Sequence, residues 1–428
     1  MPHNVSPTEE LRYQARMLIA IRVCLYIGCM GCYFIGVMGT LTFAMGGGVV
    51  ENALAVALLN LSLMVGGVVG GKALDAVGPS RYLRVCAGAE VASGLLYQVL
   101  GSSVAGVLTG AALFGFAFGM ADIVARSYAA YLTGDTGELK RINSAVTLAS
   151  NVSVAVGPMI GGAIALAAPT QAVFLFMAAC AALALVPASR FRRLRDPSSA
   201  DAKGPEGSEG LADGASVRAG FAQIFGSEVL SLLFWATMLS FLGYGAFDPL
   251  ESLFYRDVLK VGASWMGWLS ALAGVGGIVG ACLSGRIPTG HVNVRTMLAV
   301  LAVHGAGCLL YVSTPNVAVA CAGQFTLGAA FSAFGPIKDT LVQVHTPLSR
   351  IGRVNAAMSA GYNLAGVVPL LCAPAIAAAL GVQGTLVGAG VVVTAIPLFI
   401  IVTHGHRLAS MVAGERGRGY SGEGNQGE

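Results

Sequence analysis

Long apolar segments alternate with short polar ones along almost the whole chain. Apolar runs of about eighteen residues or more are typical of membrane-spanning helices. Their spacing predicts two sets of six spans, separated by one longer polar segment. The predicted spans cover residues 18–44, 52–72, 83–103, 104–127, 143–167, 170–188, 227–249, 263–285, 293–313, 316–338, 354–379 and 382–403. The pattern therefore predicts an all-α membrane protein with twelve transmembrane helices.

Polar sequence marks the expected domain boundaries. Residues 190–224 and 404–428 are rich in Gly, Ser and charged residues, a composition typical of flexible or disordered segments. The first span is longer than the core of a signal peptide and has no small-residue cleavage site, so we expect it to be retained. The predicted organisation is an N-terminal arm, a six-helix bundle, a linker, a second six-helix bundle and a tail, over 1–17, 18–189, 190–224, 225–403 and 404–428.

The positive charges predict the orientation in the membrane. If the N-terminus is cytoplasmic and the chain alternates, all Lys and Arg residues except Arg256 and Lys260 lie on the cytoplasmic side. We therefore expect a multi-pass protein of the cell (plasma) membrane with both termini in the cytoplasm. The formal net charge of +4 reflects this topology and does not indicate nucleic-acid binding.

The composition is typical of a membrane protein and does not indicate a metal or cofactor site. Hydrophobic residues make up 55% of the chain, charged residues 11%, and mean hydropathy is +0.74. Cys29 and Cys32 lie at helical spacing with no second ligand pair nearby, so we interpret them as packed apolar residues. His304 stands alone within a span and is interpreted in the same way. No metal or cofactor is expected.

Two strings recur at nearly half the chain length. "VGGVVG" at 65–70 returns as "VGGIVG" at 275–280, and "RINSAVTLASN" from Arg141 returns as "RVNAAMSAGYN" from Arg353. Steps of four keep polar residues on one helix face. The resulting polar stripes are Asn143, Thr147 and Asn151 in the fifth span, and Asn355, Ser359 and Asn363 in the eleventh. Two similar halves in the same orientation form a parallel repeat, which is typical of secondary transporters.

The repeat also predicts helix packing. Glycine allows two membrane helices to approach closely, whereas polar side chains facing lipid would lack partners. We expect both polar stripes to face the interface between the halves or a cavity. We expect the glycine strings to face the opposite half, with the second span on the eleventh and the eighth on the fifth.

The string "GGKALDAVGPSR" at 70–81 resembles the major facilitator superfamily signature between the second and third spans. The matching positions are Gly71, Asp75, Gly78 and Arg81. Ala76 and Pro79 replace basic residues of that signature. The string "GPMIGG" matches the exporter motif of the fifth span through Gly157, Pro158, Gly161 and Gly162. Within the superfamily, the chain resembles the macrolide and siderophore exporters, a branch of drug:proton antiporters.

This resemblance implies two pseudo-symmetric six-helix bundles, and it implies roles for individual residues in a gate and a cavity. The cytoplasmic gate would comprise Gly71, Asp75, Gly78, Arg81, Asp122 and Arg126. Within this gate, Asp122 is expected to pair with Arg126 at i+4 or with Arg81. Alternatively, Asp122 carries a proton or forms a plain ion pair without a role in the gate. The alternative interpretation of Asp75 is a solvated loop residue without a role in the gate. The cavity candidates are Arg22, Tyr26, Tyr33, Trp235, Tyr244 and Gln324, although Arg22 could instead snorkel to the interface.

Three further acidic residues lie near or inside other spans. Glu90 in the third span either pairs with a neighbour or carries a proton. Asp248 and Glu251, at the end of the seventh span, are expected to be interfacial and solvated.

The expected function is export of a small amphipathic compound such as a drug, siderophore or metabolite. The protein would work as a proton-coupled efflux antiporter by alternating access, as a monomer, with the substrate, protons and the lipid bilayer as its partners. An importer on the same fold is the first alternative. A membrane sensor or polytopic enzyme is disfavoured, because the sequence has no catalytic triad pattern and its glycine strings lie inside helices.

Asp75→Asn is expected to reduce transport strongly while the protein still inserts and expresses. The carboxylate charge would be needed to hold the gate against a helix N-terminus or an arginine. Transport assays, normalised to the amount of protein in the membrane, check this. Full flux from the variant would contradict the gate role.

Overall fold

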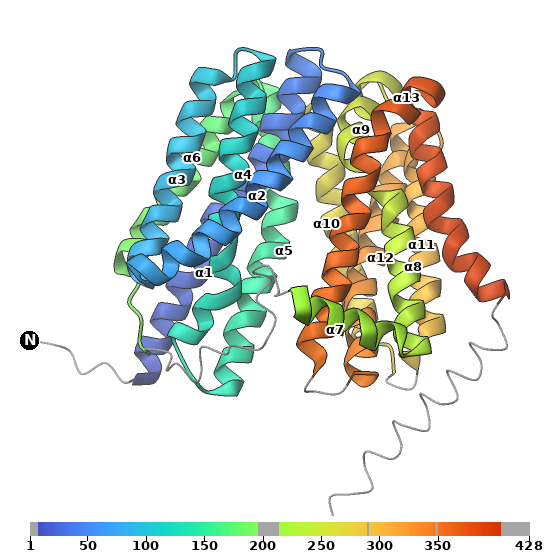
Figure 1. The fold of residues 1–428 in the computed structure, drawn as a ribbon. Coiled ribbons are helices and arrows are strands. Elements are labelled where there is room, and N and C mark those ends of the chain that lie inside the picture. The colour runs from blue at the N-terminus through green and yellow to red at the C-terminus, as the bar shows by residue number, and fades with distance from the viewer. Residues whose placement is uncertain (1–6, 196–213, 289–290, 347–349, 404–428) are drawn as a thin grey trace, which may run out of the picture. The chain divides into compact units, whose positions relative to one another are not determined.

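The computed structural model describes residues 7–195, 214–288, 291–346 and 350–403, and in these residues all regular structure is helical (Figure 1). The chain forms two compact units. Unit 1 comprises Met1–Leu211 with Tyr255–Ala271, and unit 2 comprises Ala212–Phe254 with Leu272–Glu428. The predicted all-α membrane fold is confirmed.

Unit 1 contains the first six spans. Its elements are α1 (Pro7–Gly31), the π-helix η1 (Cys32–Ala44), α2 (Val49–Val77), α3 (Pro79–Leu100), α4 (Val104–Ser127), the 3₁₀-helix η2 (Tyr128–Tyr131), α5 (Thr136–Ala167) and α6 (Ala172–Arg190). Gly78 ends α2 with a φ of 79°, a conformation that favours glycine, and Pro79 starts α3. Side-chain oxygens of Ser103 and Asp135 cap α4 and α5.

Unit 2 contains most of the second half. Its elements are α7 (Gly214–Phe225), α8 (Glu228–Tyr244), α9 (Phe247–Leu253), α11 (Val294–Val312), α12 (Val317–Val344) and α13 (Ile351–Thr403). The π-helix η3 (Phe254–Val258) and α10 (Ser264–Ser284) each have residues in both units. Ser227, Asn293 and Asn316 cap α8, α11 and α12.

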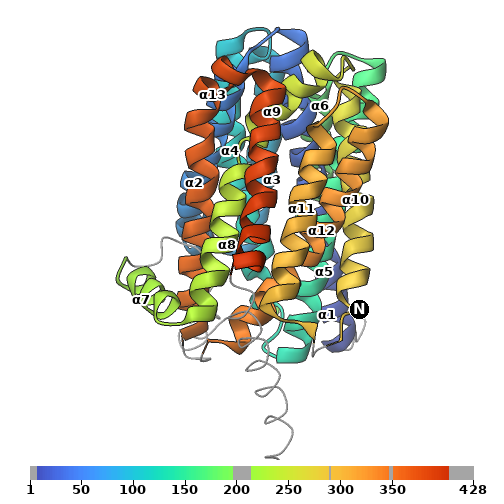
Figure 2. The same ribbon diagram turned by 90° about the vertical axis from the view of Figure 1, so that its right-hand side faces the viewer.

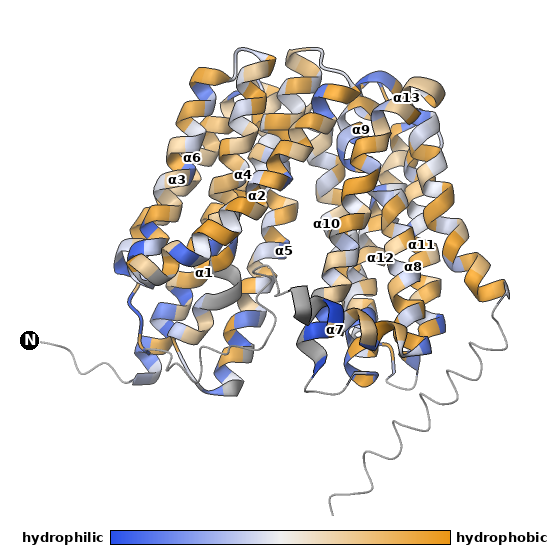
Figure 3. Ribbon diagram, viewed as in Figure 1, coloured by the Kyte–Doolittle hydropathy of each residue, from blue (hydrophilic) through white to orange (hydrophobic). Residues whose placement is uncertain are grey.

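Ten segments of the described chain are long and apolar enough to cross a membrane. One of them contains α13, which is two helices joined at Gly381, where φ is 72°. A further helix, α3, has 22 residues and carries charged side chains. With these two additions, the described residues account for the twelve predicted membrane helices. Apolar residues cover the helices along most of their length, and polar residues gather toward their ends (Figure 3).

Two predicted boundaries differ from the structure. The second part of the predicted linker forms α7, which packs across α8 and α13 (Figure 2). Phe221 and Phe225 recur on one face of α7 and contact Phe234 of α8, so this apolar face stabilises a helix within an otherwise polar segment. Residues 255–271, predicted to belong to the second bundle, are part of unit 1.

The repeated glycine strings make close helix crossings inside each half. A Cβ added at Gly66 of α2 would clash with the backbone carbonyl oxygen of Phe116 on α4. In the second half, a Cβ at Gly280 of α10 would clash with the backbone carbonyl oxygen of Ala329 on α12. The prediction that these glycines face the opposite half is therefore wrong. They let the second and fourth spans, and the eighth and tenth, approach backbone to backbone.

Gly66→Ala is expected to lower the free energy of unfolding by about 1–3 kcal/mol, because the added methyl group overpacks the crossing of α2 and α4. Gly67→Ala is the matched control, since a Cβ there meets its nearest neighbour only at 4.0 Å. Thermal unfolding of both variants in detergent checks this. Equal stability of the two variants would show that the crossing is not tight.

Candidate functional site

A buried ion pair joins three helices of unit 1. Arg22 of α1 is 4% exposed, and its Nη2 donates to Oδ1 of Asp122 on α4 at 3.0 Å. Its Nε donates to Oγ of Ser150 on α5 at 2.8 Å. The guanidinium also lies 3.9 Å from the ring centroid of Tyr26, which packs on Phe118. These contacts satisfy a charge that would otherwise be costly inside the protein.

Asp122 has a partner that local spacing does not suggest, because the structure pairs it with Arg22. The expected pairing of Asp122 with Arg126 or Arg81 stays a prediction. Arg81 is exposed, and the side chains of Asp75 and Arg126 lie outside the described residues. The planar guanidinium of Arg22 can donate several hydrogen bonds at once. The Arg22 side chain therefore binds groups inside the protein and does not extend to the membrane interface.

The rest of the expected gate lies around the turn between α2 and α3. Gly71 has open space around it, and Gly78 is the turn residue. The Tyr128 hydroxyl donates to the carbonyl oxygen of Pro79 at 2.9 Å. Burial raises the pKa of Tyr128, so its phenol remains a neutral donor to this turn.

Unit 2 holds a carboxylate that sequence reasoning missed. Glu251, expected to be solvated, accepts hydrogen bonds at Oε1 from Tyr311 Oη at 2.8 Å and from Gln324 Nε2 at 2.9 Å. The seventh span continues through α9 to η3, so Glu251 lies inside it. Tyr244 also belongs to this region, with its ring centroid 5.2 Å from that of His304.

The remaining cavity candidates pack against neighbouring aromatic rings. Trp235 of unit 2 is 44% exposed and packs against Phe225 and Phe234 beside α7. Tyr33 of unit 1 is half-buried next to Phe34.

The exporter motif packs against three elements, α1, η1 and the part of α10 that belongs to unit 1. A Cβ at Gly157 would lie 2.6 Å from the carbonyl oxygen of Ile27, and one at Gly161 would meet Ile35. On the other side, a Cβ at Gly162 would lie 3.0 Å from the Cα of Gly267 in α10. The carbonyl of Pro158 faces the same glycine. The predicted contact between the fifth and eighth spans is therefore present at this motif.

The structure describes most of the side chains in the two polar stripes. In the fifth span Asn143, Thr147 and Asn151 are exposed. In the eleventh, Asn355 is exposed, Ser359 is half-buried and the side chain of Asn363 lies outside the described residues. Their orientation toward the other half, and packing of the second span on the eleventh, stay predictions.

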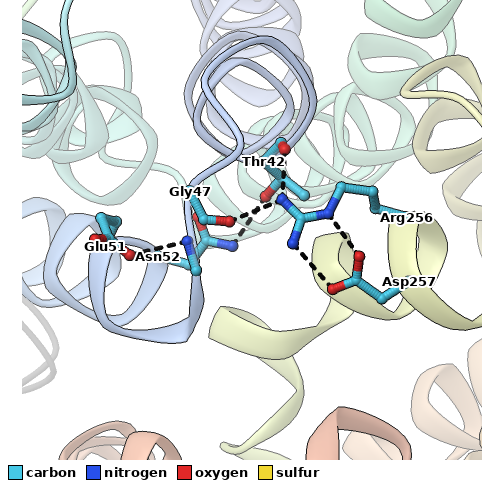
Figure 4. A network of polar contacts seen from close by, with 7 residues as sticks. Thr42, Gly47, Glu51, Asn52, Arg256 and Asp257 are labelled. Atoms are coloured by element: carbon cyan, nitrogen blue, oxygen red, sulfur yellow. Dashed lines mark hydrogen bonds and ion pairs between the residues drawn. The ribbon is translucent and has the colours of Figure 1, made fainter.

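A polar clasp closes the end of the first span in unit 1 (Figure 4). Nη1 of Arg256 donates to the carbonyl oxygens of Thr42 at 2.8 Å and Gly47 at 2.9 Å. Nε and Nη2 of Arg256 donate to the two carboxylate oxygens of Asp257 at 2.7 and 2.9 Å. Asn52 donates to Thr42 Oγ1 at 2.9 Å. Arg256 thus satisfies carbonyl groups at and beyond the end of η1.

The family model of the Major Facilitator Superfamily matches residues 18–368 and, again, residues 233–410. The chain belongs to the Major Facilitator Superfamily. No curated protein matches it. Within the described residues, no three His, Cys, Asp or Glu side chains are grouped as a metal site would require.

Solved structures of superfamily transporters share this fold at low identity. The nucleoside transporter NupG has a TM-score of 0.65 and 11% identity, covering 92% of this chain and 98% of its own. A bacterial homolog of the human lysosomal transporter Spinster has a TM-score of 0.64 and 14% identity, over 94% and 97%. The human organic anion transporter MFSD10 has a TM-score of 0.57 and 16% identity, over 91% and 99%. These likenesses show the fold, and membership of the superfamily indicates a multi-pass membrane transporter.

Arg256→Gln is expected to weaken the clasp. Losing charge-assisted bonds to the Thr42 and Gly47 carbonyls should lower the local opening free energy by about 1.5–3 kcal/mol. Hydrogen–deuterium exchange of the peptide containing residues 40–52 measures this. Lys260→Gln, which removes a nearby exposed charge, is the control. Unchanged exchange in Arg256→Gln would show that the clasp does not hold this segment.

Proposed function

We propose that this superfamily member is a secondary active transporter that exports a small amphipathic compound in exchange for protons. The observation that carries the proposal is the buried pair between Arg22 and Asp122. Charged side chains inside transmembrane segments are rare, and they mark substrate and proton pathways. The protein would act by alternating access in the cell membrane as a monomer.

The pair is suited to couple a proton to a conformational change. Asp122 is 23% exposed and Arg22 4% exposed, so the carboxylate is the more accessible partner. A proton on Asp122 removes its charge and weakens its hold on Arg22. Because Arg22 also bonds Ser150, this change reaches α1, α4 and α5 together. Protonation would therefore alter how three helices are held.

The second half offers contacts for an amphipathic molecule. Glu251 with Gln324 provides a polar group, and aromatic rings lie nearby. Phe241 is in contact with His304, Phe331 and Tyr362. Phe331 and Tyr362 are partly exposed, so they can contact a ligand. Carboxylate and rings together favour a compound with an aromatic or aliphatic body and a polar, hydrogen-bond-donating end.

Export is favoured by the "GPMIGG" motif, in which Gly157 and Gly162 pack on two different elements. A panel of drugs and metabolites, tested on a strain lacking this protein, identifies substrates by intracellular accumulation. The strain should accumulate more of a substrate, and restoring the protein should reverse this. Lower accumulation in the strain lacking the protein would indicate import.

Asp122→Asn is expected to abolish substrate-driven proton movement in proteoliposomes while substrate binding remains. The amide keeps the size of the side chain but cannot take up a proton. Glu138→Gln is the control, because Glu138 forms a partly exposed ion pair with Arg141 at 2.8 Å. Transport that is unaffected by collapse of the proton gradient would contradict proton coupling. Loss of both binding and thermal stability in Asp122→Asn would indicate a purely structural pair.

A further inference from the structure

A second carboxyl group lies deeper in unit 1 and has no role in the sites above. Glu90 of α3 is 0% exposed, and neither carboxylate oxygen has a hydrogen-bond partner among the described residues. It lies near the middle of α3, which packs on α4 and α6 (Figure 1). An ionised carboxylate without partners is very costly in such a place, whereas the protonated acid is neutral.

The second half carries an ionisable side chain at the matching position. The string "EVASGLLY" at 90–97 aligns with "HGAGCLLY" at 304–311 through the shared Leu-Leu-Tyr. His304 on α11 is 2% exposed, and its Nδ1 has no hydrogen-bond partner in the described part of the chain. Tyr97 and Tyr311, which end the two strings, are both fully buried. Both repeats therefore bury a proton-binding group at the same place.

Thiols lie in the surroundings of Glu90. They belong to Cys29, Cys32, Cys86 and Cys180. Thiols are weak hydrogen-bond donors, so they cannot compensate a carboxylate charge. Arg22 lies two helical turns before Cys29 on α1, and Asp122 and Ser150 bind its guanidinium.

The other charged groups on the neighbouring helices are held or exposed. Among described side chains, α2 offers Glu51, which accepts from the backbone N–H of Gly48, and Lys72, which is exposed. α4 offers Asp122, and α6 offers Arg190, exposed at its end. On α3 itself, Arg81 and Arg84 are exposed.

We propose that Glu90 is a second proton-binding site. With its proton, Glu90 is neutral, as its fully buried position without hydrogen-bond partners requires. When its O–H bond breaks, the proton passes to water and a carboxylate remains on Glu90. Use of this proton in transport rests on the proposed function, but the site itself does not.

Infrared spectroscopy of the whole protein in lipid tests the site without any substrate. A protonated carboxyl group has a C=O stretching band that carboxylates and amides lack, and the band moves to lower frequency in D₂O. The spectrum of the wild type minus that of Glu90→Gln should contain this band. The band should move in D₂O, because a usable proton exchanges with water. Glu138→Gln, whose carboxylate is paired with Arg141, should remove nothing.

Two results would overturn the site. Absence of the band from the difference spectrum would show that Glu90 is ionised. A band that never moves in D₂O would show a sealed proton with only a structural role. If Glu90→Gln fails to fold, Glu90→Asp serves instead and should displace the band rather than remove it.

The infrared test needs no substrate and no flux. A result against the Glu90 site is therefore distinguishable from a result against the proposed function, which comes from the accumulation and proton-movement assays.

Discussion

The contact on which the first half depends is the buried pair between Arg22 and Asp122. Placing two charges away from water is unfavourable, and removing one partner from such a pair typically costs about 3–5 kcal/mol. The pair is satisfied because Ser150 and the ring of Tyr26 complete the surroundings of the guanidinium. It therefore fixes the relative positions of α1, α4 and α5, and any change in its charge acts on all three.

Close glycine crossings provide the second constraint, and both halves use it. Gly66 brings α2 onto α4, and Gly280 brings α10 onto α12. These contacts make rigid helix pairs, because backbones in direct contact leave no side chains that can rearrange. The π-helices η1 and η3, which end the first and seventh spans, and the Arg256 clasp lie where the chain is less regular.

Features that depend on residues close together in the sequence could be predicted. Span lengths, the repeat and the motifs depend on spacing within a few residues, so the twelve helices and the superfamily could be inferred. The pairing of Asp122 with Arg22 could not be inferred, because the two residues are 100 positions apart. Glycine in a string indicates close approach but not which helix approaches. Glu251 was misjudged because the seventh span was ended at 249, whereas the structure continues it to Val258.

A double-mutant cycle on Arg22 and Asp122 tests the central claim most directly. The free energies of unfolding of Arg22→Gln, Asp122→Asn and the double variant would be measured against the wild type in one detergent. If the pair holds the three helices, the losses of unfolding free energy in the two single variants do not add up to the loss in the double variant. The coupling energy is then about 1–3 kcal/mol. Additivity within about 0.5 kcal/mol would show that the two charges act independently and would contradict this account.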